Sequence, residues 1–269
     1  MSRPIHALVG ALVVGLLACA PTSDAAPDPG AADAEAPDAT AESVSRDLQP
    51  EGTAVDEQSA PPNTLSERER REGWRLLFDG RTTDGWRGYK QAAMPAGWEV
   101  VDGALTRTGA TTDIITADRF RDFELTLEWR IAPGGNSGIF FRAVEGDGAI
   151  YEYAPEVQVL DDAGHADGRS ELTSAGSNFA LHPARRGVVR PAGQWNSMRI
   201  RVEGNRVQQW MNDALMVDYE IGSEDWKRRV AASKFAAWPE YGLAPEGHIG
   251  LQEHGNQVAF RSIKIREIR

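Results

Sequence analysis

Residues 122–131 read DFELTLEWRI, and this stretch decides the fold class. Apolar side chains occupy every second position, and polar or charged side chains occupy the positions between them. A period of two is the pattern of a β-strand with one buried and one solvated face. We therefore predict a strand whose inward side chains are Phe123, Leu125, Leu127, Trp129 and Ile131.

The same alternation recurs beyond residue 73. In WNSMRIRVEG (195–204) it precedes Gly204-Asn205, a pair that favours a hairpin turn into RVQQWMND. Further strands are predicted at 74–78, 98–103, 138–143, 156–160, 214–219, 248–254 and 258–268, the last with a bulge near Arg261 or Ser262. One short helix is predicted near 224–232. About ten short strands between turn signals indicate an all-β fold of two packed antiparallel sheets, a sandwich or jelly roll.

Composition divides the 269 residues into three parts. Residues 20–72 carry thirteen acidic side chains and four arginines, are rich in Ala and Pro, and contain no aromatic side chain. Such a segment cannot bury enough apolar surface to fold alone. All eight tryptophans follow it. We predict a signal peptide at 1–19, a disordered acidic tether at 20–72 and one folded domain at 73–269.

The first twenty residues read MSRPIHALVGALVVGLLACA, with an apolar run at 7–17 that is too short for a stable membrane span. This pattern predicts an export signal. Leu-Leu-Ala-Cys at 16–19 resembles a bacterial lipoprotein box, in which the cysteine is lipidated and becomes the new N-terminus. An ordinary signal peptide cut after Ala25 or Ala26 is the alternative. We expect a lipidated Cys19 and a protein of the cell envelope, facing the periplasm or exterior and attached to the membrane only through its lipid.

Charge and missing motifs exclude several classes of function. The net charge of −11 comes mostly from the tether, and residues 73–269 carry twenty-seven acidic and twenty-four basic side chains. No basic field for nucleic acid exists, so the domain suits an uncharged ligand. The single cysteine excludes an intrachain disulfide. A serine nucleophile elbow, HExxH, a P-loop and a CxxC pair are all missing, which argues against serine hydrolases, zinc proteases, nucleotide enzymes and thiol redox proteins.

Two predicted strands place pairs of polar side chains on one face. In EVQVL (156–160), Glu156 and Gln158 point together, either into a ligand groove or to solvent. In HIGLQEH (248–254), Gln252 and His254 share a face in the same way. Both pairs are therefore candidate ligand-binding groups, with solvation as the alternative.

Other candidates lie at strand ends and in loops. His165 follows two aspartates, including Asp161, whose charge would raise its basicity, although a surface loop with an incidental histidine shows the same pattern. Asn136 and Arg142 bracket the stretch NSGIFFR, and this arginine either snorkels to water or donates to sugar hydroxyls. Trp238 is a candidate for stacking on a sugar, although most tryptophans of a sandwich belong to the core.

These clusters, taken together, resemble a known family. The chain is similar to the bacterial 3-keto-disaccharide hydrolases over essentially all of 73–269, in the blocks GWRLLFDGRTTDGWRGY, NSGIFFR, PEVQVLDDAGHADG, SAGSNFALHP, GQWNSMRIRVEGNRVQQWMND and EGHIGLQEHGNQVAFRSIKIREI. The resemblance implies a concanavalin-like double-sheet jelly roll that acts on glycosides oxidised to a ketone at C3. Asn178-Phe179 departs from the aromatic-aspartate pair expected there, so the resemblance leaves the substrate preference open.

The resemblance also implies a chemistry. A C3 ketone acidifies the C2 hydrogen, so a base can form an enolate, the C1 substituent can leave by elimination, and water can complete a net hydrolysis. The implied bases are Glu156 or His165, with Asp161 orienting the base or sharing a metal. Arg142, Gln158, Gln252 and His254 would bind the sugar or stabilise the enolate oxygen. A divalent metal is compatible with this chemistry, but no cofactor is assigned.

Two other functions fit the same pattern. A cell-surface carbohydrate-binding module would use the same groove without a base, and an envelope structural protein would bind no ligand. The enzyme hypothesis predicts an oxidised glycoside as substrate and a sugar 3-dehydrogenase as its functional partner.

Overall fold

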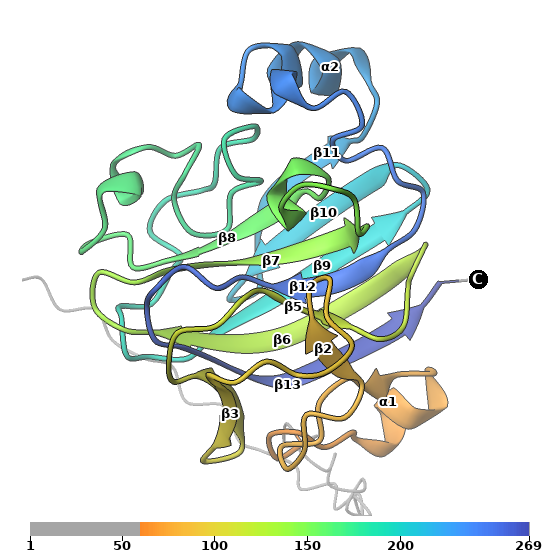
Figure 1. Cartoon of the computed structure of the whole chain (residues 1–269), viewed down its shortest axis with the longest axis vertical. Coiled ribbons are helices and arrows are strands. Elements are labelled where there is room, and N and C mark those ends of the chain that lie inside the picture. Colours follow the sequence, from red (N-terminus) through yellow and green to blue (C-terminus); the bar gives the residue numbers. More distant parts are fainter. Residues whose placement is uncertain (1–59, 269) are drawn as a thin grey trace, which may run out of the picture. The chain divides into compact units, whose positions relative to one another are not determined.

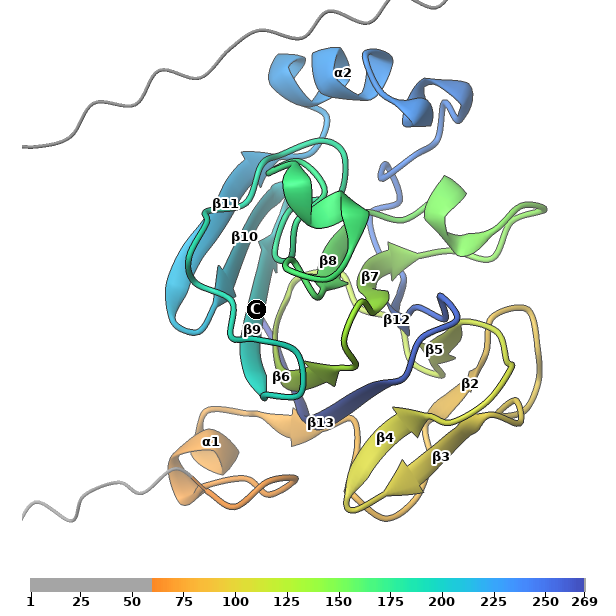
Figure 2. The same cartoon turned by 90° about the vertical axis from the view of Figure 1, so that its left-hand side faces the viewer.

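The computed structural model describes residues 60–268, so the predicted signal peptide, Cys19 and most of the predicted tether lie outside the described residues. Two antiparallel sheets pack face to face, which confirms the predicted all-β sandwich (Figures 1 and 2). Among residues 60–268, no helix has the length and apolar character needed to cross a membrane.

The larger sheet has eight strands and the smaller has five. The larger runs in the order β11-β10-β9-β6-β13-β4-β3, with β1 also paired to β13, and the smaller runs β2-β5-β12-β7-β8. The eight-stranded sheet comprises β1 (Arg75–Leu76), β3 (Trp98–Val101), β4 (Ala104–Arg107), β6 (Phe123–Ile131), β9 (Asn196–Glu203), β10 (Arg206–Met211), β11 (Ala214–Glu220) and β13 (Val258–Glu267). The five-stranded sheet comprises β2 (Trp86–Gly88), β5 (Ile114–Thr116), β7 (Asn136–Ala143), β8 (Glu156–Leu160) and β12 (His248–Leu251).

Helical segments are short and lie outside the sheets. They are α1 (Glu67–Arg71), α2 (Glu224–Ala231) and the 3₁₀ turns η1 (Ile150–Glu152), η2 (Ala166–Arg169) and η3 (Lys234–Ala237). The helix predicted near 224–232 is confirmed as α2. Sequence analysis missed α1, β2, β4 and β5 because each is only three to five residues long, too short to show a period.

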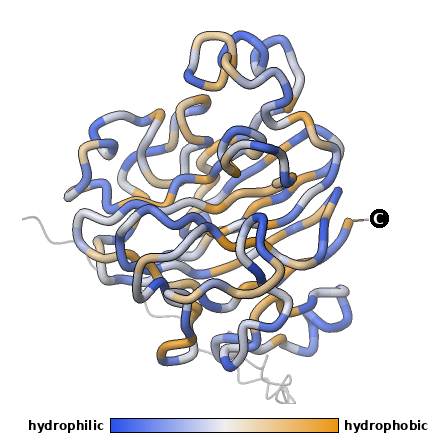
Figure 3. Tube along the Cα trace, in the orientation of Figure 1, coloured by the Kyte–Doolittle hydropathy of each residue, from blue (hydrophilic) through white to orange (hydrophobic). Residues whose placement is uncertain are grey.

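The core forms where the inward faces of the two sheets meet. Phe123, Leu125 and Ile200 enter it from the larger sheet, and Val157 and Leu251 enter it from the smaller sheet. All five side chains are fully buried. Hydrophobic and hydrophilic residues alternate along the strands, as the period-2 pattern predicts (Figure 3). The predicted hairpin at Gly204 is also confirmed, because Glu203 pairs with Arg206 across it.

The described residues of the predicted tether contain a helix. Residues 60–72, assigned to the disordered tether in the sequence analysis, include helix α1. Ser66 begins this helix with a capping box: its hydroxyl accepts from the Glu69 amide at 3.1 Å, and its own amide donates to the Glu69 carboxylate at 2.7 Å. The other Glu69 oxygen accepts from Lys264 of β13 at 2.8 Å. The charges that suggested disorder therefore cap the helix and attach it to the sheet.

Asn63 also joins this N-terminal segment to the sheet. The predicted bulge in β13 is confirmed by a register shift between Arg261 and Lys264. The Ser262 amide there donates to Asn63 Oδ1 at 2.8 Å, and Asn63 Nδ2 donates to the Gly103 carbonyl at 2.8 Å. One side chain thus satisfies two backbone groups that the strands leave unpaired.

We expect Asn63→Ala to lower the free energy of unfolding by about 1–3 kcal/mol, because it leaves a part-buried amide and a carbonyl without partners. Urea denaturation measures the change. The matched control is Glu67→Ala, whose exposed ion pair with Arg71 should contribute less than about 0.5 kcal/mol. Equal stability of the two variants would contradict this role for Asn63.

Candidate active site

A cavity of about 220 Å³ lies on the outer face of the five-stranded sheet. Strands β7 and β8, the segments next to β5 and β12, and the three 3₁₀ turns or the loops near them supply its walls. The lining residues are Asp113, Asn136, Tyr151, Glu156, Gln158, Asp167, Phe179, Lys234, Gln252, Glu253 and His254. Five of them were predicted site residues, drawn from segments more than a hundred residues apart: Asn136, Glu156, Gln158, Gln252 and His254.

Alternation along β8 directs Glu156 and Gln158 into this cavity. Val157 and Val159 between them point into the core between the sheets. The side chains of the opposite parity therefore face outward, yet Glu156 is only 4% exposed and Gln158 is fully buried. Of the two alternatives left open by the sequence, the groove is the one observed.

Gly138 makes room for the Glu156 carboxyl group. It lies on β7 and pairs with Gln158 of β8. A Cβ atom at Gly138 would lie 2.3 Å from Glu156 Oε1, closer than any real carbon–oxygen contact. The missing side chain leaves the space that the Glu156 carboxyl group occupies.

Burial raises the pKa of Glu156 to about 8, and the negative charges of Asp113 and Asp167 add to this effect. The positive charge of Lys234 and a hydrogen bond from Gln252 oppose it. A carboxyl group with such a pKa exchanges a proton near neutral pH, as a general acid or base must.

Three amide side chains around Glu156 have polar atoms without partners. Gln158 Oε1 and Nε2, Asn136 Oδ1 and Gln252 Oε1 are buried and accept or donate no hydrogen bond within residues 60–268. Leaving such groups unsatisfied costs roughly 1–3 kcal/mol each. A ligand with several hydroxyl groups would satisfy them, since each amide offers both donors and acceptors.

Several lining residues escaped sequence analysis. Asp113 precedes the short strand β5, and its Oδ1 accepts from the Glu253 amide at 2.7 Å. Burial raises the pKa of Asp113 to about 6; the hydrogen bond from the Glu253 amide lowers it, and the Glu253 charge raises it. Tyr151 and Phe179 add aromatic surface, and Lys234 adds a cation. Of these four residues, only Phe179 had been noted in the sequence, where Asn178-Phe179 departs from the family pattern.

His165 and Asp161, predicted as catalytic, are not among the residues that line the cavity. His165 Nδ1 accepts from the Asp167 amide at 3.1 Å and so caps η2. Asp161 Oδ2 accepts from the Gly134 amide at 2.7 Å. Both polar groups hold the loop that follows β8. Their predicted action at the reacting atoms stays a prediction.

Arg142 is also outside the cavity. A bulge in β7 sets His248 opposite Ala143 and Gly250 opposite Phe140, and Arg142 within it has a φ of 51°. The bulge breaks the alternation, so the guanidinium group donates to the Gly204 carbonyl of the β9–β10 hairpin. Arg142 therefore joins the two sheets, and its predicted role in sugar binding stays a prediction.

Trp238 supports the site indirectly. It is not among the lining residues, but its ring contacts Tyr151 edge-on, with the ring centroids 5.8 Å apart. Trp238 thus contacts a lining aromatic residue, and its predicted stacking on a ligand stays a prediction.

The acidic and histidine side chains do not converge as metal ligands. Within residues 60–268, no group of three or more His, Cys, Asp or Glu side chains is arranged to hold a metal ion. Asp162, the second of the two aspartates before His165, accepts from the Ala175 amide at 2.8 Å.

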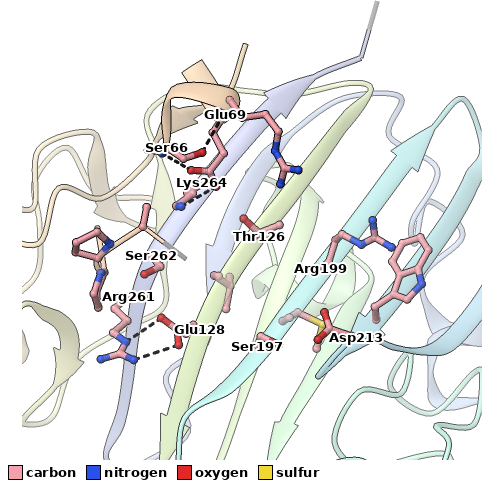
Figure 4. A pocket seen from close by; sticks show the side chains of 17 residues that line it. Ser66, Glu69, Thr126, Glu128, Ser197, Arg199, Asp213, Arg261, Ser262 and Lys264 are labelled. Carbon is pink, nitrogen blue, oxygen red and sulfur yellow. Dashed lines mark hydrogen bonds and ion pairs between the residues drawn. The ribbon is translucent and has the colours of Figure 1, made fainter. Parts of the chain in front are cut away.

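A second, larger cavity of about 850 Å³ lies on the outer face of the eight-stranded sheet (Figure 4). Its charges are largely paired within the protein: Arg261 binds both oxygens of Glu128 at 2.9 and 3.1 Å, and Lys264 binds Glu69. It contains no buried polar atom without a partner among the described residues. The smaller cavity is therefore the better candidate for chemistry.

We expect Glu156→Gln to stabilise the protein in a pH-dependent way. In the folded chain Glu156 keeps its proton up to about pH 8, whereas its ordinary pKa is 4.5. Protonated Glu156 therefore contributes its full stabilisation below pH 4.5. This stabilisation is lost as the pH rises through 8. The variant should exceed wild type by a few kcal/mol at pH 8.5, at about 1.4 kcal/mol per pKa unit, with the excess shrinking toward pH 4.5.

Urea unfolding between pH 4.5 and 8.5 measures this difference. Glu240→Gln, an exposed change outside the cavity, serves as control and should show no such trend. If the difference in unfolding free energy between Glu156→Gln and wild type did not change with pH, the raised pKa would be contradicted.

Comparison with known proteins connects this chain to a family. The family model described as a 3-keto-alpha-glucoside-1,2-lyase-like domain matches residues 73–266. A 3-keto-disaccharide hydrolase of Bacteroides thetaiotaomicron is 35% identical over 227 residues, covering 72% of this chain and 78% of the relative. A crystal structure of a candidate glycosyl hydrolase from Parabacteroides distasonis has a TM-score of 0.73 at 32% identity, covering 78% of this chain and 100% of its own. A second such structure from that species has a TM-score of 0.57 at 26% identity, covering 72% and 99%.

Proposed function

This chain belongs to the 3-keto-alpha-glucoside-1,2-lyase-like family, and on that premise we propose that it cleaves 3-keto-glycosides by removing the proton at C2. The observation that carries the proposal is the buried Glu156 carboxyl group, whose pKa is raised to about 8. It lies in a cavity with unsatisfied amides that suit a sugar.

The reaction uses the acidity that a ketone gives to its neighbour. Glu156 takes the C2 proton, the C–H electron pair becomes the C2–C3 double bond, and the C3 oxygen takes the negative charge. The C3 carbonyl then re-forms as the C1–C2 double bond appears, and the C1–O bond breaks. The departing oxygen takes the proton that Glu156 carries. Water adding across C1–C2, with its oxygen to C1, completes a net hydrolysis.

The cavity suits the oxidised ring of the substrate. Its volume of about 220 Å³ is below the ~300–1,000 Å³ of clefts that enclose larger ligands. Asn136, Gln158 and Gln252 offer amides to the ring hydroxyls, and His254 lies exposed at the rim. The rings of Tyr151 and Phe179 offer apolar surface for a sugar face. The leaving sugar would extend outside the cavity.

Deuterium incorporation tests this proposal. The whole mature protein is incubated with a 3-keto-glucoside in deuterated water, and aglycone release and deuterium at C2 are followed. We expect both in wild type, and a reduction of about 10²–10⁴-fold in Glu156→Gln, because proton transfer is lost. Glu240→Gln should behave as wild type. Binding without release or exchange would contradict the enzyme and favour a carbohydrate-binding module.

The pH dependence follows from the same carboxyl group. A general base acts when ionised, so kcat/KM should rise with pH up to about 8 as Glu156 loses its proton. In Glu156→Gln, the rise of kcat/KM toward pH 8 should be absent. A wild-type kcat/KM that falls through pH 8 would instead show Glu156 acting as an acid.

We further propose that the enzyme works in the cell envelope, tethered by a lipid on Cys19 and facing the periplasm or exterior. The short apolar run and the Leu-Leu-Ala-Cys sequence support this. A sugar 3-dehydrogenase would supply the ketone. Mass spectrometry of the mature N-terminus should find Cys19 first and acylated, and an N-terminus after Ala25 or Ala26 would contradict the anchor.

A further inference from the structure

Lys234 places a positive charge in the wall of the cavity. It opens the turn η3 and lines the cavity together with Glu156. Within residues 60–268, no hydrogen bond or ion pair joins its ammonium group to another side chain or carbonyl. The charge of Lys234 nevertheless acts on Glu156, where it favours the ionised form. The ammonium group therefore has its three donors available to a ligand.

Aromatic rings hold this ammonium group. Its nitrogen lies 4.5 Å from the centre of the Phe179 ring, 5.2 Å from that of Phe235 and 5.4 Å from that of Tyr151. Ring faces attract a cation without neutralising its charge, unlike a carboxylate partner. The charge is thus positioned but not paired.

The turn that carries Lys234 is anchored in the core by stacked aromatic residues. Phe235 is 1% exposed and stacks on Tyr241, with ring centroids 4.0 Å apart. Tyr241 stacks on Trp226 of α2 at 5.8 Å, and Trp226 stacks on Tyr219 of β11 at 5.7 Å. This series of rings connects η3 to the eight-stranded sheet, so packing fixes the turn. The Lys234 side chain is itself exposed, and the rings of Phe179 and Tyr151 hold its ammonium group.

From this geometry we propose that the Lys234 ammonium group is the catalytic cation that pairs with the C3 oxygen as the enolate forms. The inference rests on the proposed function. When Glu156 takes the C2 proton, the negative charge appears on the C3 oxygen, and the ammonium group donates a hydrogen bond to it while keeping its own protons. As the C1–O bond breaks, the charge leaves the C3 oxygen and the hydrogen bond weakens. Such a fixed charge stabilises the transition state more than the neutral ketone.

Kinetics of Lys234 variants test this role. Lys234→Met keeps the length and apolar stem, and should lower the kcat of both C2 deuterium exchange and aglycone release by about 10²–10³-fold with little change in KM. Lys234→Arg keeps the charge and should restore part of the loss. Lys227→Met, which removes an exposed ion pair with Glu224 on α2, should match wild type. Unchanged kcat with a raised KM in Lys234→Met would overturn the proposal.

A binding measurement separates this inference from the proposed function. Ascorbate is a stable ring enolate, and calorimetry of wild type, Lys234→Met and Glu156→Gln reports affinity without turnover. We expect ascorbate to bind wild type and Glu156→Gln, and to bind Lys234→Met at least tenfold more weakly. Equal affinity in wild type and Lys234→Met, or no binding to wild type, overturns the role of Lys234. Failure of wild type to exchange or release a 3-keto-glucoside overturns the proposed function instead.

Discussion

The five-stranded sheet is buried on both faces, and this constraint organises the rest of the molecule. Every residue of β7 and β8 is buried. One face packs on the eight-stranded sheet through apolar side chains, while the other carries Glu156, Gln158 and Asn136 beneath loops and 3₁₀ turns. Polar groups removed from water must find partners or remain costly. Hydrogen bonds within the loops satisfy Asp161 and His165, whereas amide atoms of Asn136, Gln158 and Gln252 in the cavity have no partner among the described residues.

The residues of the site therefore lower the folding stability of the protein. A buried carboxyl group with a pKa near 8 and several unpaired amide atoms would each be improved, for folding alone, by apolar replacements. Gly138 is needed for this arrangement, because a side chain there would fill the space that the Glu156 carboxyl group occupies. A sugar ring with hydroxyl groups and a developing enolate would satisfy these groups together. Catalytic groups with perturbed pKa values concentrate at such destabilised positions.

Rigid packing places the remaining parts of the site. Arg142, turned by a bulge, binds the Gly204 carbonyl and connects the sheets at one end of β7. The stacked rings from Tyr219 to Phe235 connect the larger sheet to η3. Lys234 thus reaches the cavity from an element far from β8 in the chain, while a cation and a carboxyl group stay close without forming an ion pair. Charges held apart in this way remain available to a substrate.

Period-2 alternation by itself determined the sandwich class, the faces of β6, β8 and β12, and the shared face of Glu156 and Gln158, because side-chain direction along a strand is a local property. Gln252 and His254 also reach the cavity, but they lie beyond the end of β12. Asn136 was predicted as a site residue from the NSGIFFR block, which resembles the family. Tertiary structure alone decided which face is covered, and hence that Glu156 is desolvated. It also placed Arg142, His165 and Asp161 outside the cavity lining. Asp113 and Lys234, which were not predicted, are part of that lining. A bulge, a loop hydrogen bond and a ring stack join residues distant in sequence, so no local pattern records them.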